Sequence, residues 1–279
     1  MKNISQVKNN IIIEDISNFN LDETFNCGQC FRWNKISDNY FTGIAFGKAL
    51  NIYSHNNTIV FENSSITDYN NIWHNYFDLN TDYNKIKDTI SKIHPTLKIA
   101  STYAPGIRIL KQDPWEALCS FIISQNNNIP RIKGIVERLC NCFGNEIQPG
   151  FFSFPSYQVI STLSKNELAP LKCGFRDNYI IDAAKKVSSG EINFKKIKEL
   201  PIDLARKELM KIKGVGPKVA ECTLLYGLHR LDAFPIDVWM SRALKTFFPD
   251  KSISYFGEYA GIAQQYIFHY TRMNPDLVN

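Results

Sequence analysis

The chain has 279 residues, of which 44% are hydrophobic, so it can bury a substantial core in one large or two modest domains. Its formal net charge of +5 is mildly basic, which suits a polyanionic partner without requiring one. No apolar run is long enough to span a bilayer, and the first residues lack the apolar core of a secretory signal. We therefore expect a cytoplasmic protein that does not contact membranes. Its seven scattered cysteines predict reduced thiols and no metal site.

Residues 1–100 are expected to form a domain built on a small antiparallel sheet. Strand-like runs separated by Asn, Ser and Gly lie at 10–13, 40–46, 49–53 and 58–61. Helices are predicted at 66–77 and 83–93, where His94-Pro95 ends the second. Both helices are expected to cover one face of the sheet.

Residues 101–279 are expected to form an all-helical domain. Asp113 is predicted as an N-cap with Glu116 closing a box-like pair, and Ser164 with Glu167 as a second capping box. Because no linker is evident, the two domains are expected to pack together in an α+β architecture, with a site between them. The other predicted helices cover residues 130–144, 178–189, 201–212, 217–228, 238–248 and 255–270.

The most informative segment runs from Leu204 to Cys222, where two predicted helices flank Gly214-Val215-Gly216. Glycine permits positive φ and close backbone approach, so this turn and the next helix N-terminus can present N–H groups to a phosphate. A bare Gly-x-Gly turn is also typical of an ordinary helical hairpin. The flanking pattern favours a helix-hairpin-helix that grips DNA.

Lys218 lies in the first turn of the second hairpin helix, where the helix dipole and neighbouring lysines disfavour its protonation. A partly neutral amine can attack a sugar carbon and hold the opened sugar as a Schiff base. A lysine that only contacts phosphate is an open alternative. Nineteen positions later, Asp237 follows Pro235-Ile236, where it can cap a helix and also stabilise charge at an anomeric carbon.

Several motifs together resemble the helix-hairpin-helix superfamily of DNA glycosylases and, more narrowly, the eukaryotic-type 8-oxoguanine DNA glycosylases. The lysine is typical of the bifunctional branch, which also cleaves the strand. The matching segments cover nearly the whole chain: Cys27-Gly-Gln-Cys-Phe-Arg-Trp33, Asp113-Pro-Trp-Glu116, Asn126-Asn-Asn-Ile-Pro-Arg131, Gly174-Phe-Arg176, the hairpin through Cys222, and Tyr259-Ala-Gly-Ile-Ala-Gln264 followed by Phe268.

The resemblance implies a pocket for one flipped base. Gly28 would offer its backbone carbonyl to the N7–H that the oxidised base carries and normal guanine lacks. Phe268 and Cys222 would sandwich the ring, and Gln264 would read its Watson–Crick edge. Simple core packing is the ordinary alternative for Phe268, which lies one helical turn after Gln264.

The resemblance also implies contacts to DNA outside that pocket. Asn126, Arg131 and Arg176 would fill the gap and hold the estranged cytosine, with Phe175 as an aromatic wedge. Taken singly, each arginine is also typical of a solvated surface or a phosphate contact. Trp239 stands where the family has a histidine that contacts phosphate, though its indole N–H can still donate one bond.

Two smaller departures are Phe175 in place of tyrosine and Pro217 in place of a small polar residue. No cysteine follows Cys222, so the iron–sulfur loop of related branches is absent and no cofactor is expected.

The resemblance therefore implies a monomeric enzyme that acts on double-stranded DNA containing an oxidised purine. It would excise 8-oxoguanine opposite cytosine through Lys218 and then cleave the strand by β-elimination. Two alternatives stay open: a monofunctional glycosylase of other specificity that uses Asp237 with water, and a non-catalytic DNA-binding module.

Overall fold

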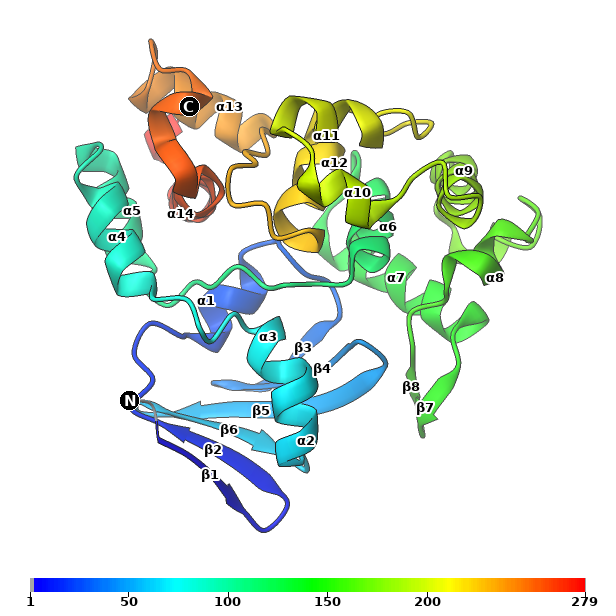
Figure 1. Ribbon diagram of the computed structural model, residues 1–279, viewed down its shortest axis with the longest axis horizontal. Helices are drawn as coiled ribbons and strands as arrows, with labels where there is room; N and C mark the ends of the chain where they lie inside the picture. Colours follow the sequence, from blue (N-terminus) through cyan, green and yellow to red (C-terminus); the bar gives the residue numbers. More distant parts are fainter. Residues whose placement is uncertain (1–2, 279) are drawn as a thin grey trace.

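The N-terminal part is a six-stranded sheet, antiparallel throughout, with strand order β1-β2-β6-β5-β4-β3. A computed structural model describes residues 3–278, and Figure 1 shows the sheet beside a larger group of helices. The expected α+β architecture is confirmed. The strands are β1 (Asn3–Val7), β2 (Asn10–Glu14), β3 (Trp33–Ser37), β4 (Tyr40–Ala45), β5 (Lys48–His55) and β6 (Thr58–Glu62).

Two strands, β1 and β3, were not predicted from the sequence. All five residues of β1 are exposed, and in β3 only Trp33 is buried. Neither strand therefore shows the alternation of buried and exposed residues by which β4 is recognised, in which every second residue is buried.

One face of the sheet is covered by helical segments that surround an aromatic core. Trp33 stacks on Phe25 with ring centroids 4.3 Å apart, and its indole N–H donates to the Tyr76 hydroxyl at 2.7 Å. The predicted helix at 66–77 is present as a continuous helical run that contains one π-helical turn. The segments are α1 (Leu21–Asn26), α2 (Ile66–Asp68), η1 (Tyr69–Trp73) and α3 (His74–Tyr76).

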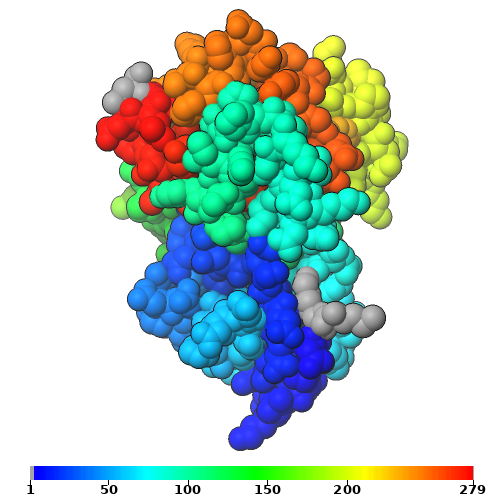
Figure 2. All heavy atoms as spheres, turned by 90° about the vertical axis from the view of Figure 1, so that its left-hand side faces the viewer, coloured from blue at the N-terminus to red at the C-terminus, as the bar shows by residue number. Residues whose placement is uncertain are grey.

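The expectation that helix 83–93 covers the sheet was wrong. This helix, α4 (Tyr83–Ser91), buries Ile86 and Ile90 in the core of the helical part, and Figure 2 shows it above the sheet strands. A second helix, α5 (Pro95–Tyr103), follows where none was predicted. Pro95 is the first residue of this helix. The side chain of His94 caps the N-terminus of α5 by accepting from the N–H of Thr96.

The rest of the chain is mainly helical. A small hairpin of β7 (Glu146–Gln148) and β8 (Phe151–Phe152) contradicts the all-helical prediction. Within residues 3–278, no helix is long and apolar enough to cross a membrane. The helices are α6 (Pro114–Ser124), α7 (Ile129–Phe143), α8 (Tyr157–Ser161), η2 (Ala169–Leu171), α9 (Arg176–Ser188), α10 (Phe194–Glu199), α11 (Ile202–Leu209), α12 (Pro217–Cys222), η3 (Thr223–Gly227), α13 (Val238–Phe247), η4 (Ile253–Tyr259), α14 (Ala260–Met273) and η5 (Pro275–Val278).

The two predicted capping boxes turned out differently. Asp113 caps α6 as expected and accepts the Glu116 backbone N–H at 3.0 Å, but the Glu116 carboxylate lies 3.5 Å from the Arg32 guanidinium, so only the side-chain half of that predicted box was wrong. Ser164 and Glu167 do form the reciprocal bonds of a capping box, yet only turns and a 3₁₀ segment follow them. The division of domains at residue 100 stays a prediction.

A buried charge cluster joins the sheet part to the helical part. The fully buried Asp78 carboxylate, which follows α3, lies 2.8 Å from Lys111 Nζ and 3.5 Å from His229 Nε2. It also accepts from the hydroxyls of Thr81 and Tyr83. Burial alone would raise the pKa of Asp78, but the hydrogen bonds and charges of His229 and Lys111 together lower it to about 2.

Because the pKa of Asp78 is lower in the folded protein, its contribution to stability is present above its unfolded pKa and disappears as pH falls toward 2. We expect Asp78→Asn to lower the free energy of unfolding at pH 7 by about 2–3 kcal/mol. The gap between variant and wild type should narrow between about pH 4 and pH 2. Urea denaturation across this range measures it, and a gap that does not change with pH would contradict the assignment.

Candidate active site

A cleft of about 1270 Å³ brings together residues from distant parts of the chain. It is larger than the roughly 300–1,000 Å³ typical of small-molecule pockets, which suits a ligand of macromolecular size. Its walls come from the α1–β3 loop, the α6–α7 loop, the starts of α12 and α13, and α14. Seven of the predicted site residues line it: Gly28, Asn126, Gly216, Lys218, Asp237, Trp239 and Phe268.

Lys218 is positioned by the start of α12, where Gly216 is the N-cap and Pro217 the first helical residue. Its half-buried ammonium donates to Ser124 Oγ at 3.1 Å and lies 5.0 Å from the ring centroid of Phe121. Within residues 3–278, no carboxylate forms an ion pair with it. The amine is therefore held at the cleft wall by α6, through two contacts that no sequence motif indicated.

Asp237 caps α13, as predicted, by accepting the Met240 N–H at 2.9 Å. It also lines the cleft, so the cap fixes the carboxylate where it faces the same space as Lys218. The catalytic role of Asp237 stays a prediction.

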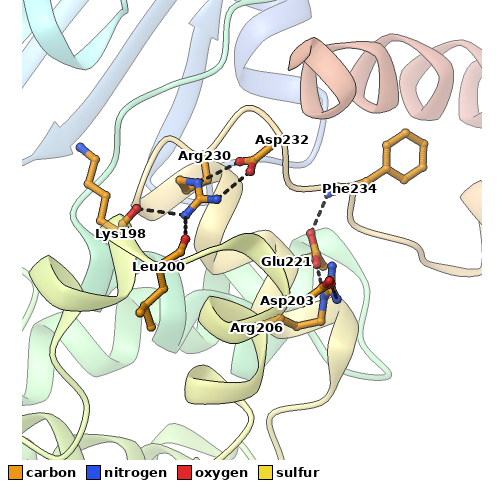
Figure 3. A network of polar contacts seen from close by, with 8 residues as sticks. All are labelled: Lys198, Leu200, Asp203, Arg206, Glu221, Arg230, Asp232 and Phe234. Atoms are coloured by element: carbon orange, nitrogen blue, oxygen red, sulfur yellow. Dashed lines mark hydrogen bonds and ion pairs between the residues drawn. The ribbon is translucent and has the colours of Figure 1, made fainter. Parts of the chain in front are cut away.

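A buried carboxylate links the helix that carries Lys218 to the loop that leads to Asp237. Glu221, one turn after Lys218 on α12, accepts the backbone N–H of Phe234 at 2.7 Å, three residues before Asp237. Its other oxygen pairs with Arg206 of α11, as Figure 3 shows. The helix that carries the lysine is thereby bonded to the loop that carries the aspartate.

Arg230 braces the other end of that loop (Figure 3). Its guanidinium donates to the backbone carbonyls of Lys198 and Leu200 at the end of α10, at 3.0 and 2.6 Å. It also forms a two-point contact with the Asp232 carboxylate, at 2.9 and 2.6 Å. The approach to Asp237 is thus fixed at both ends.

Gly28 also lines the cleft, in the left-handed region of backbone conformation that favours glycine, with φ of +85°. A Cβ there would lie 3.4 Å from the Phe268 ring, an ordinary contact distance, so the backbone conformation and not a lack of space favours glycine at this position. The adjacent Cys27 carbonyl accepts from Gln265 of α14 at 3.0 Å. Gln29 is fully buried and bonded to three backbone groups, which holds the segment rigid from the other side.

Cys222 and Gln264 lie beside the cleft and do not line it. Each is only 3% exposed. Burial raises the pKa of the Cys222 thiol to about 11, although the charge of Lys218 opposes this. Gln264 Oε1 is buried without a hydrogen-bond partner among the described residues. Such an acceptor is costly to leave unpaired, so it is available to a donor that enters from the cleft.

The predicted DNA contacts fall into two groups. Arg131 and Phe175 are exposed, Phe175 by 48%, and both are free to meet a partner. Arg176 is only 3% exposed and donates to the carbonyls of Gln125 and Asn126 at 3.0 and 3.2 Å. In this state its guanidinium holds the loop in which Asn126 adopts a positive φ of 47°. To contact an estranged base, the Arg176 guanidinium would have to replace its hydrogen bonds to these carbonyls by hydrogen bonds to the base.

Three cations in the cleft were not predicted. Arg242 and Lys245 lie on α13 and Arg272 on α14, and in the described part of the chain none has a carboxylate within ion-pair distance. Arg242 lies 5.6 Å from the ring centroid of Trp239. The cleft is therefore cationic on two walls, which suits an anionic polymer. Within residues 3–278, no group of three or more His, Cys, Asp or Glu is placed to hold a metal.

The hairpin, the lysine on α12 and the capping aspartate define the class as helix-hairpin-helix DNA glycosylases. Residues 11–118 match the family model for the N-terminal domain of 8-oxoguanine DNA glycosylase, and residues 119–255 match the HhH-GPD superfamily of base excision DNA repair proteins. A solved structure described as MBOgg1 with a low-affinity DNA ligand is 43% identical, with a TM-score of 0.93 and 99% of both chains covered.

The 8-oxoguanine glycosylase/lyase of Clostridium acetobutylicum, solved with double-stranded DNA containing cytosine opposite 8-oxoG, is 35% identical. Its TM-score is 0.91 and 98% of both chains is covered. The chain belongs to the 8-oxoguanine DNA glycosylase family. The N-glycosylase/DNA lyase of Saccharomyces cerevisiae is 40% identical over 167 residues, which cover 54% of this chain and 44% of that protein. The matches span about half the length of such curated relatives.

The two hairpin glycines differ in what a methyl group would meet. At Gly214, φ is +76° and a Cβ would lie 2.3 Å from the Tyr179 ring, whereas at Gly216 it would meet nothing within 4 Å. We expect Gly214→Ala to lower the free energy of unfolding by about 1–3 kcal/mol. Gly216→Ala should cost less, about 0.5–1 kcal/mol, because alanine is a poorer N-cap than glycine.

Gly216→Ala should nevertheless weaken binding to any DNA duplex several-fold, because the methyl group keeps a phosphate from the N–H groups at the start of α12. Urea denaturation measures the free energy of unfolding of both variants, and fluorescence anisotropy with labelled duplex measures their DNA binding. Equal stability of the two variants would show that Gly214 is not under the predicted strain.

Proposed function

We propose that this protein is a DNA-repair glycosylase with lyase activity that removes 8-oxoguanine from duplex DNA, best opposite cytosine. The observation that carries the proposal is that Lys218 and Asp237 line one cleft together with Gly28 and Phe268. We further propose that it acts as a cytoplasmic monomer and uses no metal or organic cofactor.

The flipped base would enter between α14 and the Gly28 segment. Its N7–H would donate to the Gly28 carbonyl, which the rigid segment around Gln29 holds in place. The unpaired Gln264 Oε1 would accept from the N1–H or 2-amino group of the base. With Phe268 against one face of the ring and Cys222 on the other, these contacts would offset an unstacking cost of a few kcal/mol.

The chemistry would begin at C1′ of the lesion nucleotide. Once the Lys218 ammonium has released a proton to solvent, its nitrogen attacks this carbon while the base departs with the electrons of the glycosidic bond. The proton that the nitrogen loses as the new C–N bond forms passes to the departing base. Asp237 stabilises the positive charge that develops on the sugar. Opening of the sugar ring gives an imine, and loss of a proton from C2′ then expels the 3′ phosphate.

The remaining DNA contacts would lie outside the base pocket. Arg131 and Arg176 would hold the estranged cytosine, with Asn126 and Phe175 filling the space left by the flipped base. Backbone N–H groups between Gly214 and Gly216 would bind a phosphate. An indole N–H from Trp239 would bind a second phosphate.

Lys218→Gln should abolish both base release and strand cleavage, because a neutral amide can neither attack C1′ nor form an imine. The measurement is borohydride trapping on duplexes with 8-oxoguanine opposite each normal base, run in EDTA with undamaged guanine as control. Wild type should form an adduct only on the lesion and best opposite cytosine. Normal excision and nicking by the variant would contradict the lysine mechanism.

The same assay separates the alternatives. Base release by wild type without an adduct or a nick indicates a monofunctional glycosylase that uses water. Neither release nor adduct on any damaged duplex indicates a DNA-binding module.

Asp237→Asn should lower the single-turnover rate of excision by roughly 10²–10³-fold, because it removes the charge that stabilises the sugar cation. Asparagine is as good an N-cap as aspartate, so thermal unfolding should be unchanged. Asp237→Ala, which removes both cap and charge, is the matched control for stability. An Asn variant with the wild-type rate would assign Asp237 to capping alone.

A further inference from the structure

Arg272 is packed into the base-binding wall of the cleft. It lies one helical turn after Phe268 on α14, with its guanidinium carbon 6.0 Å from the centroid of that ring. A Cβ built on Gly28 would lie 3.5 Å from Arg272 Nη1 and 3.4 Å from Phe268 Cε1. The guanidinium and the aromatic ring therefore both lie against Gly28.

The charge of Arg272 is not neutralised by the protein. Within residues 3–278 its guanidinium forms no ion pair or hydrogen bond, and the Phe268 ring is its one interaction. It is half-buried and faces the cleft. Its positive charge also acts on the neighbouring His269. Burial is the larger cause that lowers the pKa of His269, and the charge of Arg272 is the second. A half-buried cation with free N–H groups is suited to an oxygen acceptor from a ligand.

We propose that Arg272 recognises the carbonyl oxygen at position 8 of the oxidised purine, as a second specificity contact beside the Gly28 carbonyl. This inference rests on the function proposed above. In 8-oxoguanine the N7–H donor and the O8 acceptor are adjacent on one edge of the ring. A donor packed against Gly28 can satisfy O8 while the Gly28 carbonyl satisfies N7–H. Guanine carries only hydrogen at position 8 and cannot complete the pair.

A phosphate oxygen is the other source of such an acceptor. The arrangement favours the base, because Arg272 is packed beside Gly28 and Phe268. Arg242 is the better phosphate ligand, since it lies on α13, above Trp239 and one turn beyond the Asp237 cap. Arg242 therefore serves as the matched control: it is the same residue type, without an ion pair in residues 3–278, on another wall of the same cleft.

The test measures binding of Lys218→Gln protein, which cannot turn over, with Arg272→Met or Arg242→Met added. Three duplexes are compared, with 8-oxoguanine, guanine or a tetrahydrofuran abasic analogue opposite cytosine. Arg272→Met should weaken binding to the 8-oxoguanine duplex by roughly 10- to 100-fold, the range for a charge-assisted hydrogen bond, and leave the abasic duplex unchanged. Arg242→Met should weaken all three equally.

Equal losses on all three duplexes for Arg272→Met would overturn the assignment and make Arg272 a phosphate ligand. No loss on the lesion would overturn it as well. Single-turnover excision by the Arg272→Met protein, with Lys218 intact, gives a second readout that should fall with lesion binding. Wild-type protein that excises nothing would overturn the proposed function itself, whereas active wild type with an equally active variant overturns only the role of Arg272.

Discussion

The candidate site depends on the hydrogen bond from the Phe234 backbone N–H to the buried Glu221 carboxylate. Lys218 and Asp237 lie on different elements, so only contacts between those elements can hold the two side chains in register. Glu221 shares a helix with the lysine and bonds to the loop that ends at the aspartate. Arg206 neutralises its charge, so the carboxylate can stay buried at 5% exposure and still accept from the loop.

A second set of buried polar groups fixes the opposite wall. Gln29 and Gln265 are both fully buried. The Gln29 amide bonds to backbone groups of α1 and of the linker before α6, and the Gln265 amide donates to the Cys27 carbonyl, two residues before Gln29. Each of these bonds is costly to leave unmade in a dry interior. They therefore fix the backbone on either side of Gly28, which lines the same cleft as Lys218 and Asp237.

The charges of the cleft are divided by function. Asp237 presents its carboxylate to the cleft, whereas two buried acids nearby are paired within the protein: Glu221 with Arg206 and a backbone N–H, and Glu116 with Arg32. The cations Arg242, Lys245 and Arg272 keep their charge unpaired within the described residues. A cleft that presents more cations than carboxylates attracts an anionic ligand at long range.

The sequence alone determined those features whose interactions join residues close together in the chain. Local signals were enough for the hairpin, for the Asp237 cap and for most helices, because caps, turns and apolar spacing are read within a few residues. The motifs around Gly28, Lys218 and Phe268 indicated one pocket by resemblance. Strands β1 and β3 were missed because their sequences lack the alternation of apolar and polar residues that marks a strand. Their pairing with β2 and β4 determines them instead.

Only the tertiary structure could decide contacts between segments far apart in the chain. It placed α4 against the helical core, paired Glu116 with Arg32, occupied Arg176 with backbone carbonyls, and brought Ser124 to Lys218 and Arg272 to Gly28. Each of these depends on which surfaces meet when distant segments pack, both within the helical part and between it and the sheet part. The neighbours of a side chain in the sequence do not determine those contacts.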